Sequence, residues 1–331
     1  MQGRTALITG VLGQDGTLLA QRLIALGYHV VGAVKPGTPV PTVGPIAAVS
    51  FAAIDLTDRS AVRELLATCR PDEIYHLAAS HHSSEREGLG TTAMERDTML
   101  RTNFLTTEVL AVSVLDLAIE SHLVYASSSQ VFTAIEPCQV VDESSLRSPS
   151  TFYGFTKSWS MEMLAFLRHQ NGLHASSAIL FNHESPLRGK QYVTRKITLA
   201  AAQAALGLRP LVEIRNLGAR TDWFSARDAV EAVMLMARSA RAADYVVASG
   251  QLHSVKDILR VAFGHVGLNW AAFVSVMDDT ESAALLGCPK ALESRLGWQR
   301  RLDFETTIIE MVEHDIRQLQ ANPSVALQNG S

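Results

Sequence analysis

The segment Gly10-Val-Leu-Gly-Gln-Asp-Gly16 constrains the fold of this chain more than any other feature of its sequence. It directly follows an apolar run that predicts a strand at Thr5–Ile8, and it opens a stretch with apolar residues at helical spacing. In such a turn Gly10 allows the sharp change of direction, Gly13 lets the backbone approach a pyrophosphate, and Gly16 lets the helix pack on the strand. The helix dipole then faces the anion. The segment therefore predicts a dinucleotide-binding strand, turn and helix, with a merely tight turn as the alternative.

The first half of the chain continues this alternation of short β-branched runs and longer helical patterns. Such alternation is typical of βαβ units that build a parallel sheet with helices on both faces. The predicted strands are Thr5–Ile8, Tyr28–Val34, Ala48–Ile54, Glu73–Leu77, Leu123–Ala126 and His174–Leu180. The predicted helices are Gly13–Leu26, Ser60–Cys69 with Ser60 as its N-cap, Met99–Glu120 and Phe152–His169. Together these elements predict an α/β fold with a doubly wound parallel Rossmann sheet.

The second half has a different pattern, in which helices are separated by only short strands. The expected elements are helices at Arg195–Leu206, Ala226–Ala240, Val255–Val266 and Phe304–Leu319, and a strand at Tyr245–Ala248. They predict a smaller C-terminal α+β lobe that binds the substrate and closes over the carboxyl ends of the sheet strands. We therefore expect a dinucleotide-binding domain at 1–180, a substrate-binding lobe at 181–320 and a frayed, polar tail at 321–331.

Composition excludes several classes of protein. The three cysteines are widely spaced, so neither a disulfide framework nor a zinc site is predicted, and a reducing cytoplasm is the expected location. No spacing of carboxylates or histidines predicts a metal site. The first apolar run is too short for export or for a membrane span. A net charge of −4 without a run of basic residues argues against nucleic acid as a partner. We expect a small-molecule substrate.

The end of the second predicted strand bears on the choice of dinucleotide. Proteins that bind NAD commonly place a carboxylate there to accept a hydrogen bond from the ribose, whereas this chain has Val34-Lys35. A cation at this point attracts a 2′-phosphate, so NADP is favoured over NAD, although Lys35 could equally be a solvated loop residue. Asp55 follows the third strand, where it could bond the adenine amino group or only cap the next helix.

Tyr153 and Lys157 lie four residues apart and so share one face of a predicted helix. The lysine ammonium is expected to depress the tyrosine pKa, which suits Tyr153 to act as general acid or base toward a hydroxyl. A cluster of hydroxyl groups at Ser127, Ser128 and Ser129 follows a predicted strand. Ligands in this architecture lie at the carboxyl ends of the strands. Ser128 or Ser129 could therefore donate to the substrate oxygen; a serine-rich turn is the alternative.

The glycine loop, the serine cluster and the Tyr-x-x-x-Lys pair together resemble the extended short-chain dehydrogenase/reductase superfamily. With the segments Phe181-Asn-His-Glu-Ser-Pro-Leu-Arg-Gly189 and Tyr192-Val-Thr-Arg-Lys-Ile197, and with Asp222-Trp223, the chain as far as Trp298 resembles the GDP-mannose 4,6-dehydratase family. The resemblance implies that Asn182 holds a phosphate, that Glu184 faces the sugar or ribose, and that Val193 and Lys196 meet the guanine. Without it, Asn182 and Glu184 would be polar residues at a strand end, and Arg195 and Lys196 a solvated helix start.

The family reaction oxidises C4 of the hexose, eliminates water across C5 and C6, and returns the hydride to C6. In the family segment Ser-Thr-Ser-Glu the glutamate removes the C5 proton and protonates the departing C6 hydroxyl, and the matching segment here is Ser127-Ser128-Ser129-Gln130. Ser128 keeps the hydroxyl that helps at C4, but the neutral amide of Gln130 cannot serve as a general base. Dehydration is the first hypothesis. A nucleotide-sugar 4-ketoreductase or C4 epimerase is the second, and a non-catalytic dinucleotide-binding paralogue is the third.

Two arginines that contact the diphosphate in the family are missing. This chain has Arg220-Thr-Asp-Trp in place of Lys-Arg-Asp-Trp, and Asp278 in place of the arginine of a later segment. Arg188, Arg215 or Arg220 could substitute, because a guanidinium can bond two phosphate oxygens at once. His82, in the loop after a predicted strand, could touch the sugar or the nicotinamide ribose. The expected substrate site comprises His82, Ser129, Asn182, Glu184, Arg188, Val193, Lys196 and Arg220, around the catalytic set Ser128, Gln130, Tyr153 and Lys157.

The expected cofactor site unites the glycine loop with residues at the ends of neighbouring strands. It comprises Gly10, Gly13, Gln14, Asp15, Gly16, Lys35, Asp55, Leu56, Leu77, Ala78, Ala79, Tyr153, Lys157 and His183. The expected substrate is a GDP-linked hexose. The arginine-rich loop that helps form the family's tetramer is replaced by Lys35-Pro-Gly-Thr-Pro, so we expect a homodimer through the Tyr153 helix, with a tetramer as the alternative.

Overall fold

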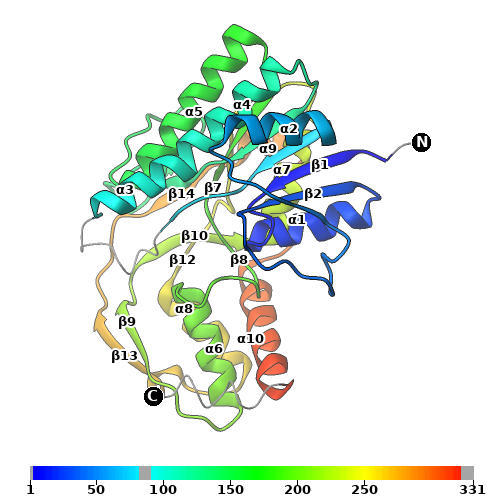
Figure 1. Ribbon diagram of the computed structural model, residues 1–331. Helices are drawn as coiled ribbons and strands as arrows, with labels where there is room; N and C mark the ends of the chain where they lie inside the picture. The colour runs from blue at the N-terminus through cyan, green and yellow to red at the C-terminus, as the bar shows by residue number, and fades with distance from the viewer. Residues whose placement is uncertain (1–2, 82–90, 322–331) are drawn as a thin grey trace.

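The computed structural model describes residues 3–81 and 91–321. A seven-stranded parallel sheet in the order β11-β7-β5-β4-β1-β2-β3 forms its centre (Figure 1). Its strands are β1 (Thr5–Thr9), β2 (His29–Val34), β3 (Ser50–Ala53), β4 (Glu73–His76), β5 (His122–Ala126), β7 (Ala175–Leu180) and β11 (Tyr245–Val247). The order reverses between β1 and β4, as in a doubly wound sheet. The predicted Rossmann fold is thus confirmed.

Helices cover both faces of this sheet, so its strands are buried on both sides. Every residue of β4 and β7 is buried, and the polar residues among them, Glu73, His76, Ser176 and Ser177, are buried as well. One face carries α1 (Gln14–Ala25), α7 (Ala226–Ala237) and α9 (Lys290–Leu296). The other carries α2 (Arg59–Cys69), α3 (Ala93–Met99), α4 (Thr106–Asp116) and α5 (Phe152–Asn171).

The strand expected at residues 245–248 belongs to the large sheet, and the helix expected at 226–240 packs on that sheet. Their predicted place in the smaller lobe is therefore wrong. β11 pairs in parallel with β7, with Tyr245 opposite Ala178, and α7 packs against α1. Their apolar residues join the core of the first half of the chain, to which β7 would otherwise present an open edge. The division of the chain at residue 180 stays a prediction.

The smaller lobe has its own apolar core. That core lies between α6 (Val193–Ala205), α8 (Val255–His265) and α10 (Phe304–Ala321), beside the parallel pair β9 (Val212–Asn216) and β13 (Val274–Asp278). The lobe is joined to the sheet layer through the three-stranded sheet β12-β10-β8 and the parallel pair β14-β6 (Figure 1). These strands are β6 (Gln139–Val141), β8 (Asn182–Glu184), β10 (Arg220–Ser225), β12 (Leu252–Ser254) and β14 (Leu285–Gly287).

A buried ion pair in the smaller lobe overturns one reading of the sequence. Arg195, which without the family resemblance would belong to a solvated helix start, is 7% exposed and pairs with Asp315 on α10. Thr198 donates a further hydrogen bond of 3.2 Å to the same carboxylate. Burial raises the pKa of Asp315, and the contact with Arg195 opposes that rise. The ion pair links α6 to α10.

Two details of the helices also differ from the prediction. Asp58, not Ser60, caps α2, because its carboxylate accepts the backbone N–H groups of Ser60 and Ala61. Asp55 does not cap that helix, and its carboxylate accepts from the backbone and hydroxyl of Thr57. The helix expected at 99–120 already begins with α3 at Ala93, passes through a π-helical segment, η2 (Leu100–Leu105), and ends with α4 at Asp116. Such π-helical segments often lie at functional sites.

Candidate active site

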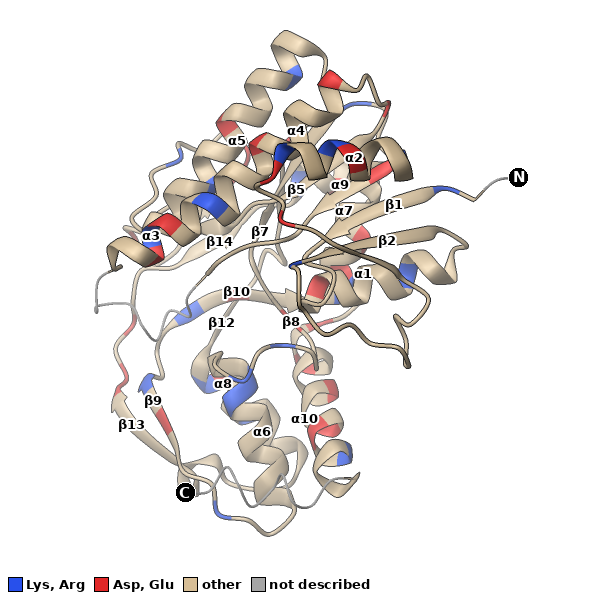
Figure 2. Ribbon diagram, viewed as in Figure 1, with Lys and Arg blue, Asp and Glu red and all other residues tan. Residues whose placement is uncertain are grey.

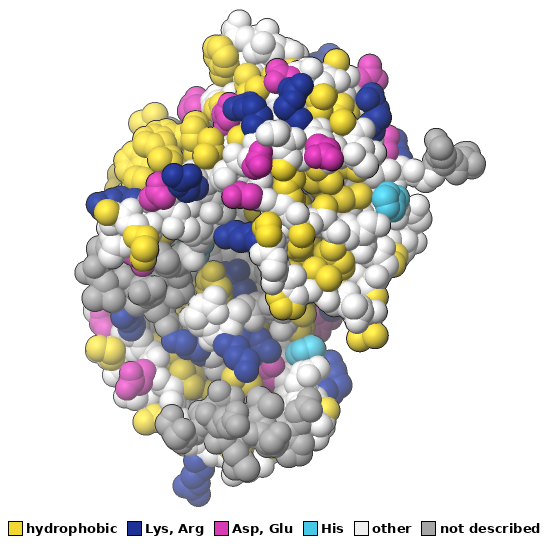
Figure 3. All heavy atoms as spheres, in the orientation of Figure 1, with side chains coloured by type: hydrophobic (Ala, Val, Ile, Leu, Met, Phe, Trp, Pro, Cys, Tyr) yellow, Lys and Arg dark blue, Asp and Glu magenta, His cyan; other side chains and the backbone are white. Residues whose placement is uncertain are grey.

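Two cavities lie along the carboxyl ends of the parallel strands, where this architecture places ligands. The first, of about 850 Å³, is bounded by the glycine loop, and the second, of about 700 Å³, by the serine cluster and β8. Leu77 and Ala79, which follow β4, line both. Figure 3 shows a hollow between the sheet layer and the smaller lobe with lysine and arginine side chains around it. In Figure 2 basic residues lie at the start of β10 and in the first turn of α6.

The glycine loop has the geometry that the sequence predicted. Gly10 has a φ of +73°, and a Cβ there would lie 2.8 Å from the backbone nitrogen of Ala78. A Cβ on Gly16 would lie 2.3 Å from the carbonyl oxygen of Gly10, so this residue serves the packing of α1 on the turn. Gly13 lines the first cavity and is the N-cap of α1 without any side-chain cap. The helix N-terminus is therefore available to an anion in the cavity.

The first cavity brings together most of the expected cofactor residues. It is lined by Gly10, Gly13, Lys35, Asp55, Leu56, Leu77, Ala78 and Ala79. Hydrogen bonds from Thr57 lower the pKa of Asp55, and the charge of Lys35 adds to that effect. The cavity thus offers a helix N-terminus for a phosphate, an apolar wall for a base and a cation at its rim. These features fit a dinucleotide, which the sequence predicted from the glycine loop alone.

Gln14, Asp15 and His183 link the glycine loop to β8. Gln14 Nε2 donates to the carbonyl oxygen of His183 at 3.1 Å, and its Oε1 accepts from Ser185 at 2.8 Å. His183 Nδ1 donates to the carbonyl of Phe181 at 2.6 Å, while Nε2 faces Asp15 Oδ2 at 2.9 Å. Burial alone would lower the pKa of His183, but the Asp15 carboxylate outweighs it, and the pKa of His183 is raised. The contact therefore favours the imidazolium form of His183 and the carboxylate form of Asp15.

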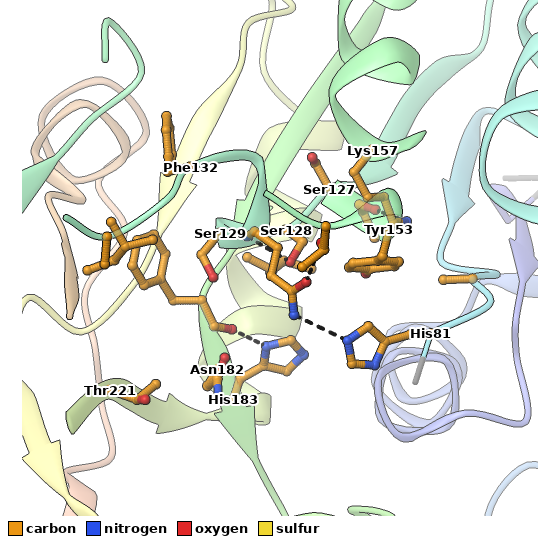
Figure 4. A pocket seen from close by; sticks show the side chains of 18 of the residues that line it. His81, Ser127, Ser128, Ser129, Phe132, Tyr153, Lys157, Asn182, His183 and Thr221 are labelled. Carbon is orange, nitrogen blue, oxygen red and sulfur yellow. Dashed lines mark hydrogen bonds between the residues drawn. The ribbon is translucent and has the colours of Figure 1, made fainter. Parts of the chain in front are cut away.

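Tyr153, Lys157 and Ser128 meet at the second cavity (Figure 4). Lys157 Nζ donates to the carbonyl of Ala126 at 2.7 Å and lies 5.6 Å from the centre of the Tyr153 ring. Burial lowers the pKa of Lys157 to about 7. Burial also raises the pKa of Tyr153, and a hydrogen bond with Ser128 opposes but does not overcome that rise. The expectation that Lys157 depresses the tyrosine pKa is wrong here, because burial dominates both groups.

Gln130 lies in the short 3₁₀ segment η3 (Ser129–Val131), directly against the N-terminus of α5. Its Oε1 accepts a hydrogen bond of 3.0 Å from Thr151, the residue that caps α5. Its backbone oxygen lies so close to α5 that a Cβ on Gly154 would come within 2.2 Å of it. These contacts fix the position of Gln130 relative to Tyr153, which lies in the first turn of α5.

His81 is the residue of this cavity that the sequence interpretation missed. Its Nε2 lies 3.3 Å from Gln130 Nε2, and its ring meets the Tyr153 ring edge-on with centroids 4.5 Å apart (Figure 4). The sequence has two histidines after this strand, and the prediction chose His82 rather than His81. The expected contact of His82 lies outside the described residues. The neighbour of His81 on its other side, Tyr192, was likewise not foreseen.

The expected substrate residues divide into two groups. Ser129, Asn182, Arg188 and Arg220 line the second cavity, together with unforeseen apolar residues such as Phe132 and Leu285. Glu184 is buried, where it accepts from Thr194 at 2.7 Å and pairs with Arg188 at 3.3 Å. Val193 and Lys196 open α6 and are not among the described residues that line either cavity. Their contact with a base stays a prediction.

Arg188 and Arg220 supply the positive charge of the second cavity. The Arg188 guanidinium stacks 3.6 Å from the centre of the Tyr192 ring. Arg220 Nη2 donates to the carbonyl of Pro137 at 3.1 Å and to the exposed carboxylate of Glu281 at 3.2 Å. Arg215 and Asp278, by contrast, lie on the β9–β13 pair and are not among the described residues lining the cavities.

The described residues show neither a metal-binding cluster nor a membrane-spanning helix. Within 3–81 and 91–321 there is no group of three or more histidines, cysteines or carboxylates that could hold a metal ion. Over the same ranges no helix is long and apolar enough to cross a membrane.

Comparison with known proteins gives one consistent family. Residues 7–311 match the family described as GDP-mannose 4,6 dehydratase. GDP-mannose 4,6 dehydratase 1 of Arabidopsis thaliana is 34% identical over 339 residues, covering 95% of this chain and 90% of that protein. Human GDP-mannose 4,6 dehydratase is 31% identical over 352 residues, covering 96% and 93%. Among solved structures, a protein of Burkholderia cenocepacia J2315 described as a candidate epimerase is 26% identical with a TM-score of 0.83, covering 95% and 98%. The chain belongs to the GDP-mannose 4,6-dehydratase family, a family of nucleotide-sugar-modifying enzymes.

Proposed function

We propose that this protein is an NADP-dependent 4,6-dehydratase of a GDP-linked hexose. The observation that carries the proposal is the meeting of Ser128, Tyr153 and Lys157 in the second cavity, which shares Leu77 and Ala79 with the first. A nicotinamide dinucleotide spanning both cavities would supply the acceptor and the donor of the hydride. In that position the protein's own side chains can work on a sugar hydroxyl held in the second cavity.

Tyr153 is the proton acceptor for the C4 hydroxyl in this proposal. Its raised pKa keeps the phenol protonated in the protein alone, so a positive charge nearby is needed to stabilise the phenolate that accepts the hydroxyl proton. The oxidised nicotinamide ring and a protonated Lys157 are such charges. Ser128, hydrogen-bonded to Tyr153, orients the same hydroxyl.

Arg188, Arg220 and Asn182 are proposed to hold the diphosphate. Both guanidinium groups line the second cavity, and Arg220 can exchange its exposed partner Glu281 for phosphate oxygens. They take the place of the two arginines that the sequence lacks relative to the family. GDP is proposed as the nucleotide because of the family to which the chain belongs.

A 4-ketoreductase or C4 epimerase is the second candidate function. The observation that favours it is Gln130, which stands where elimination needs a base and which is held by Thr151 and His81 as an amide. The third candidate, a non-catalytic binding protein, gains no support from the site, because a binder has no need of a hydroxyl, a phenol and a lysine arranged together.

Incubation of the purified protein with GDP-mannose and NADP distinguishes the candidates. We expect a product lighter by one water in the mass spectrum, with a 4-keto carbon by NMR. A product of unchanged mass but altered configuration or oxidation state would support the second candidate. A parallel incubation with UDP-glucose serves as the control for the nucleotide, and no conversion of either sugar would contradict the proposal.

Lys35 is proposed to select NADP. Substitution by aspartate should reverse the preference, since a carboxylate repels the 2′-phosphate and accepts a hydrogen bond from the ribose hydroxyl of NAD. The ratio of kcat/KM for NADP to that for NAD should fall about 10-fold or more, which corresponds to about 1.4 kcal/mol. An unchanged ratio would remove Lys35 from cofactor recognition.

We propose a homodimer formed through α5. Three large apolar side chains of this helix, Phe155, Trp159 and Phe166, are 43%, 47% and 62% exposed, and Phe104 packs against Trp159. Figure 3 shows hydrophobic side chains gathered on this side of the molecule. Such a patch is typical of an interface. Sedimentation should give a dimer for the parent and a monomer for Trp159→Glu, and a tetramer is the alternative outcome.

A further inference from the structure

Elimination of water from the 4-keto sugar needs a group that can take and return a proton beside Tyr153. Gln130 cannot be that group, because an amide does not titrate near neutrality. The structure places an imidazole directly against it: His81 Nε2 lies 3.3 Å from Gln130 Nε2. His81 also lines the second cavity, with its ring 4.5 Å from that of Tyr153.

The position of His81 is fixed from several sides. Its Nδ1 lies 3.3 Å from the Tyr192 hydroxyl. The backbone of Ser80, directly before it, accepts from and donates to the side chain of Asn103, at 3.1 and 2.8 Å. Asn103 is fully buried in η2 and also donates to Thr156 on α5, the helix that carries Tyr153. The imidazole and the phenol are thus held on one scaffold.

We propose that His81 is the acid–base residue of the elimination, in place of the carboxylate absent at position 130. This inference rests on the proposed function. Once C4 is a ketone, His81 takes the C5 proton, the electrons of the broken C5–H bond form the C5=C6 double bond, and the C6–O bond breaks. The imidazolium gives its proton to the departing hydroxyl, which leaves as water. One proton is taken and one returned, so this step consumes no further reactant.

Among the described residues that line the cavity, the other titratable groups have partners or another role, and the Tyr192 hydroxyl is the one that contacts His81 Nδ1. Asp15 and His183 are paired with each other at 2.9 Å. Lys157 donates to the carbonyl of Ala126, and Tyr153 is used at C4. The guanidinium groups of Arg188 and Arg220 stay charged and cannot act as bases.

Gln130 is well suited to be the neighbour of a histidine that changes protonation state. Its Nε2 donates to the neutral imidazole while its Oε1 accepts from Thr151, so the amide holds the ring without carrying a charge of its own. A carboxylate at this position would instead stabilise the imidazolium before the reaction, and an imidazolium cannot take up the C5 proton. We therefore assign Gln130 the role of a positioning residue.

The test separates the two halves of the reaction in single turnover with GDP-mannose and NADP in D₂O. C4 oxidation is followed by the absorbance of reduced nicotinamide, and C5 proton removal by deuterium at C5 and by loss of water. For His81→Ala we expect elimination to fall about 10²–10⁴-fold, the usual size of a proton-transfer contribution, while C4 oxidation stays within about threefold. His81→Gln, which preserves more of the volume, should behave in the same way.

Rescue distinguishes catalysis from a structural role. The double variant His81→Ala with Gln130→Glu should regain elimination, because it places a carboxylate where the family has one. A matched control is His29→Ala at the exposed amino end of β2, which should react like the parent. Thermal unfolding of each variant checks that the fold is retained.

Each outcome decides the matter. Elimination at the parent rate in His81→Ala overturns the assignment of His81 and leaves the dehydratase proposal standing. A parent protein that oxidises C4 without losing water contradicts the dehydratase proposal in favour of the second candidate, and the assignment of His81 falls with it. A parent that oxidises no C4 hydroxyl contradicts the proposed function itself, and the inference falls with it.

Discussion

The two ends of the seven-stranded sheet treat a buried charge in opposite ways. At the amino end, Glu73 of β4 is 2% exposed and accepts from Tyr75 at 2.6 Å, Tyr28 at 2.9 Å and Arg4 at 3.1 Å. At the carboxyl end, Lys157 is 1% exposed and donates to one backbone carbonyl, and burial lowers its pKa to about 7. The Glu73 carboxylate is stabilised by hydrogen-bond donors and by a positive charge. Lys157 has no such partner among the described residues, and its pKa lies near pH 7. Residues with strongly shifted pKa values are common at functional sites. The amino end of the sheet therefore stabilises the fold, and the carboxyl end carries the chemistry.

The largest expected effect is on catalysis at the carboxyl end. Tyr153→Phe keeps the ring that packs against His81 but removes the hydroxyl, so C4 oxidation should slow about 10²–10⁴-fold while the free energy of unfolding changes little. Single-turnover absorbance of reduced nicotinamide and urea unfolding measure the two quantities. A variant as fast as the parent would remove Tyr153 from the mechanism.

The matching change at the amino end should affect stability instead. Glu73→Ala leaves Tyr75 without its acceptor and Arg4 and Arg238 without their shared carboxylate, which should lower the free energy of unfolding by about 3–5 kcal/mol. Glu73→Gln, which keeps an acceptor oxygen, should lose less. Turnover of the folded protein should stay near the parent value below the unfolding transition. Slower turnover of a variant that is fully folded would show that the amino end also contributes to catalysis.

A smaller effect concerns the pH dependence of stability. The pKa of Lys157 is about 7 in the folded protein, against an ordinary value of 10.5. Between these values the unfolded chain binds more protons, so the free energy of unfolding rises with pH through this window. Lys157→Met lacks this contribution. At pH 7 the free energy of unfolding of this variant should therefore exceed that of the parent by a few kcal/mol at most. This difference should decrease toward pH 10. A difference independent of pH would show that Lys157 keeps its ordinary pKa.

Local signals in the sequence predicted the sheet and the cofactor turn well, because both depend on nearby residues. A glycine turn between a buried strand and an amphipathic helix has few alternative structures, and β1 and α1 begin within one residue of the expected positions. The placement of β11 failed, because a three-residue strand carries no record of its partner β7.

The site was predicted unevenly for the same reason. The Tyr153–Lys157 pair and the serine cluster follow from helical spacing and a strand end, and they do meet. The inward direction of His81 depends on Asn103 and Gln130, which are distant in sequence. The pKa of Tyr153 likewise depends on how much of the chain covers it, so the simple pairing with Lys157 predicted the wrong direction.

The contact between Gly154 and Gln130 has a consequence for how such an enzyme can change over evolution. It is the backbone oxygen of residue 130 that sits against α5, 2.2 Å from where a Cβ of Gly154 would be. The side chain at 130 adds one hydrogen bond to α5, which its Oε1 accepts from the N-cap residue Thr151, and a carboxylate oxygen could accept the same bond. Selection can therefore exchange a carboxylate for an amide there in a single codon change without moving the helix that carries Tyr153. The residue that serves the elimination of water can therefore change in evolution while the residues that serve C4 oxidation stay in place.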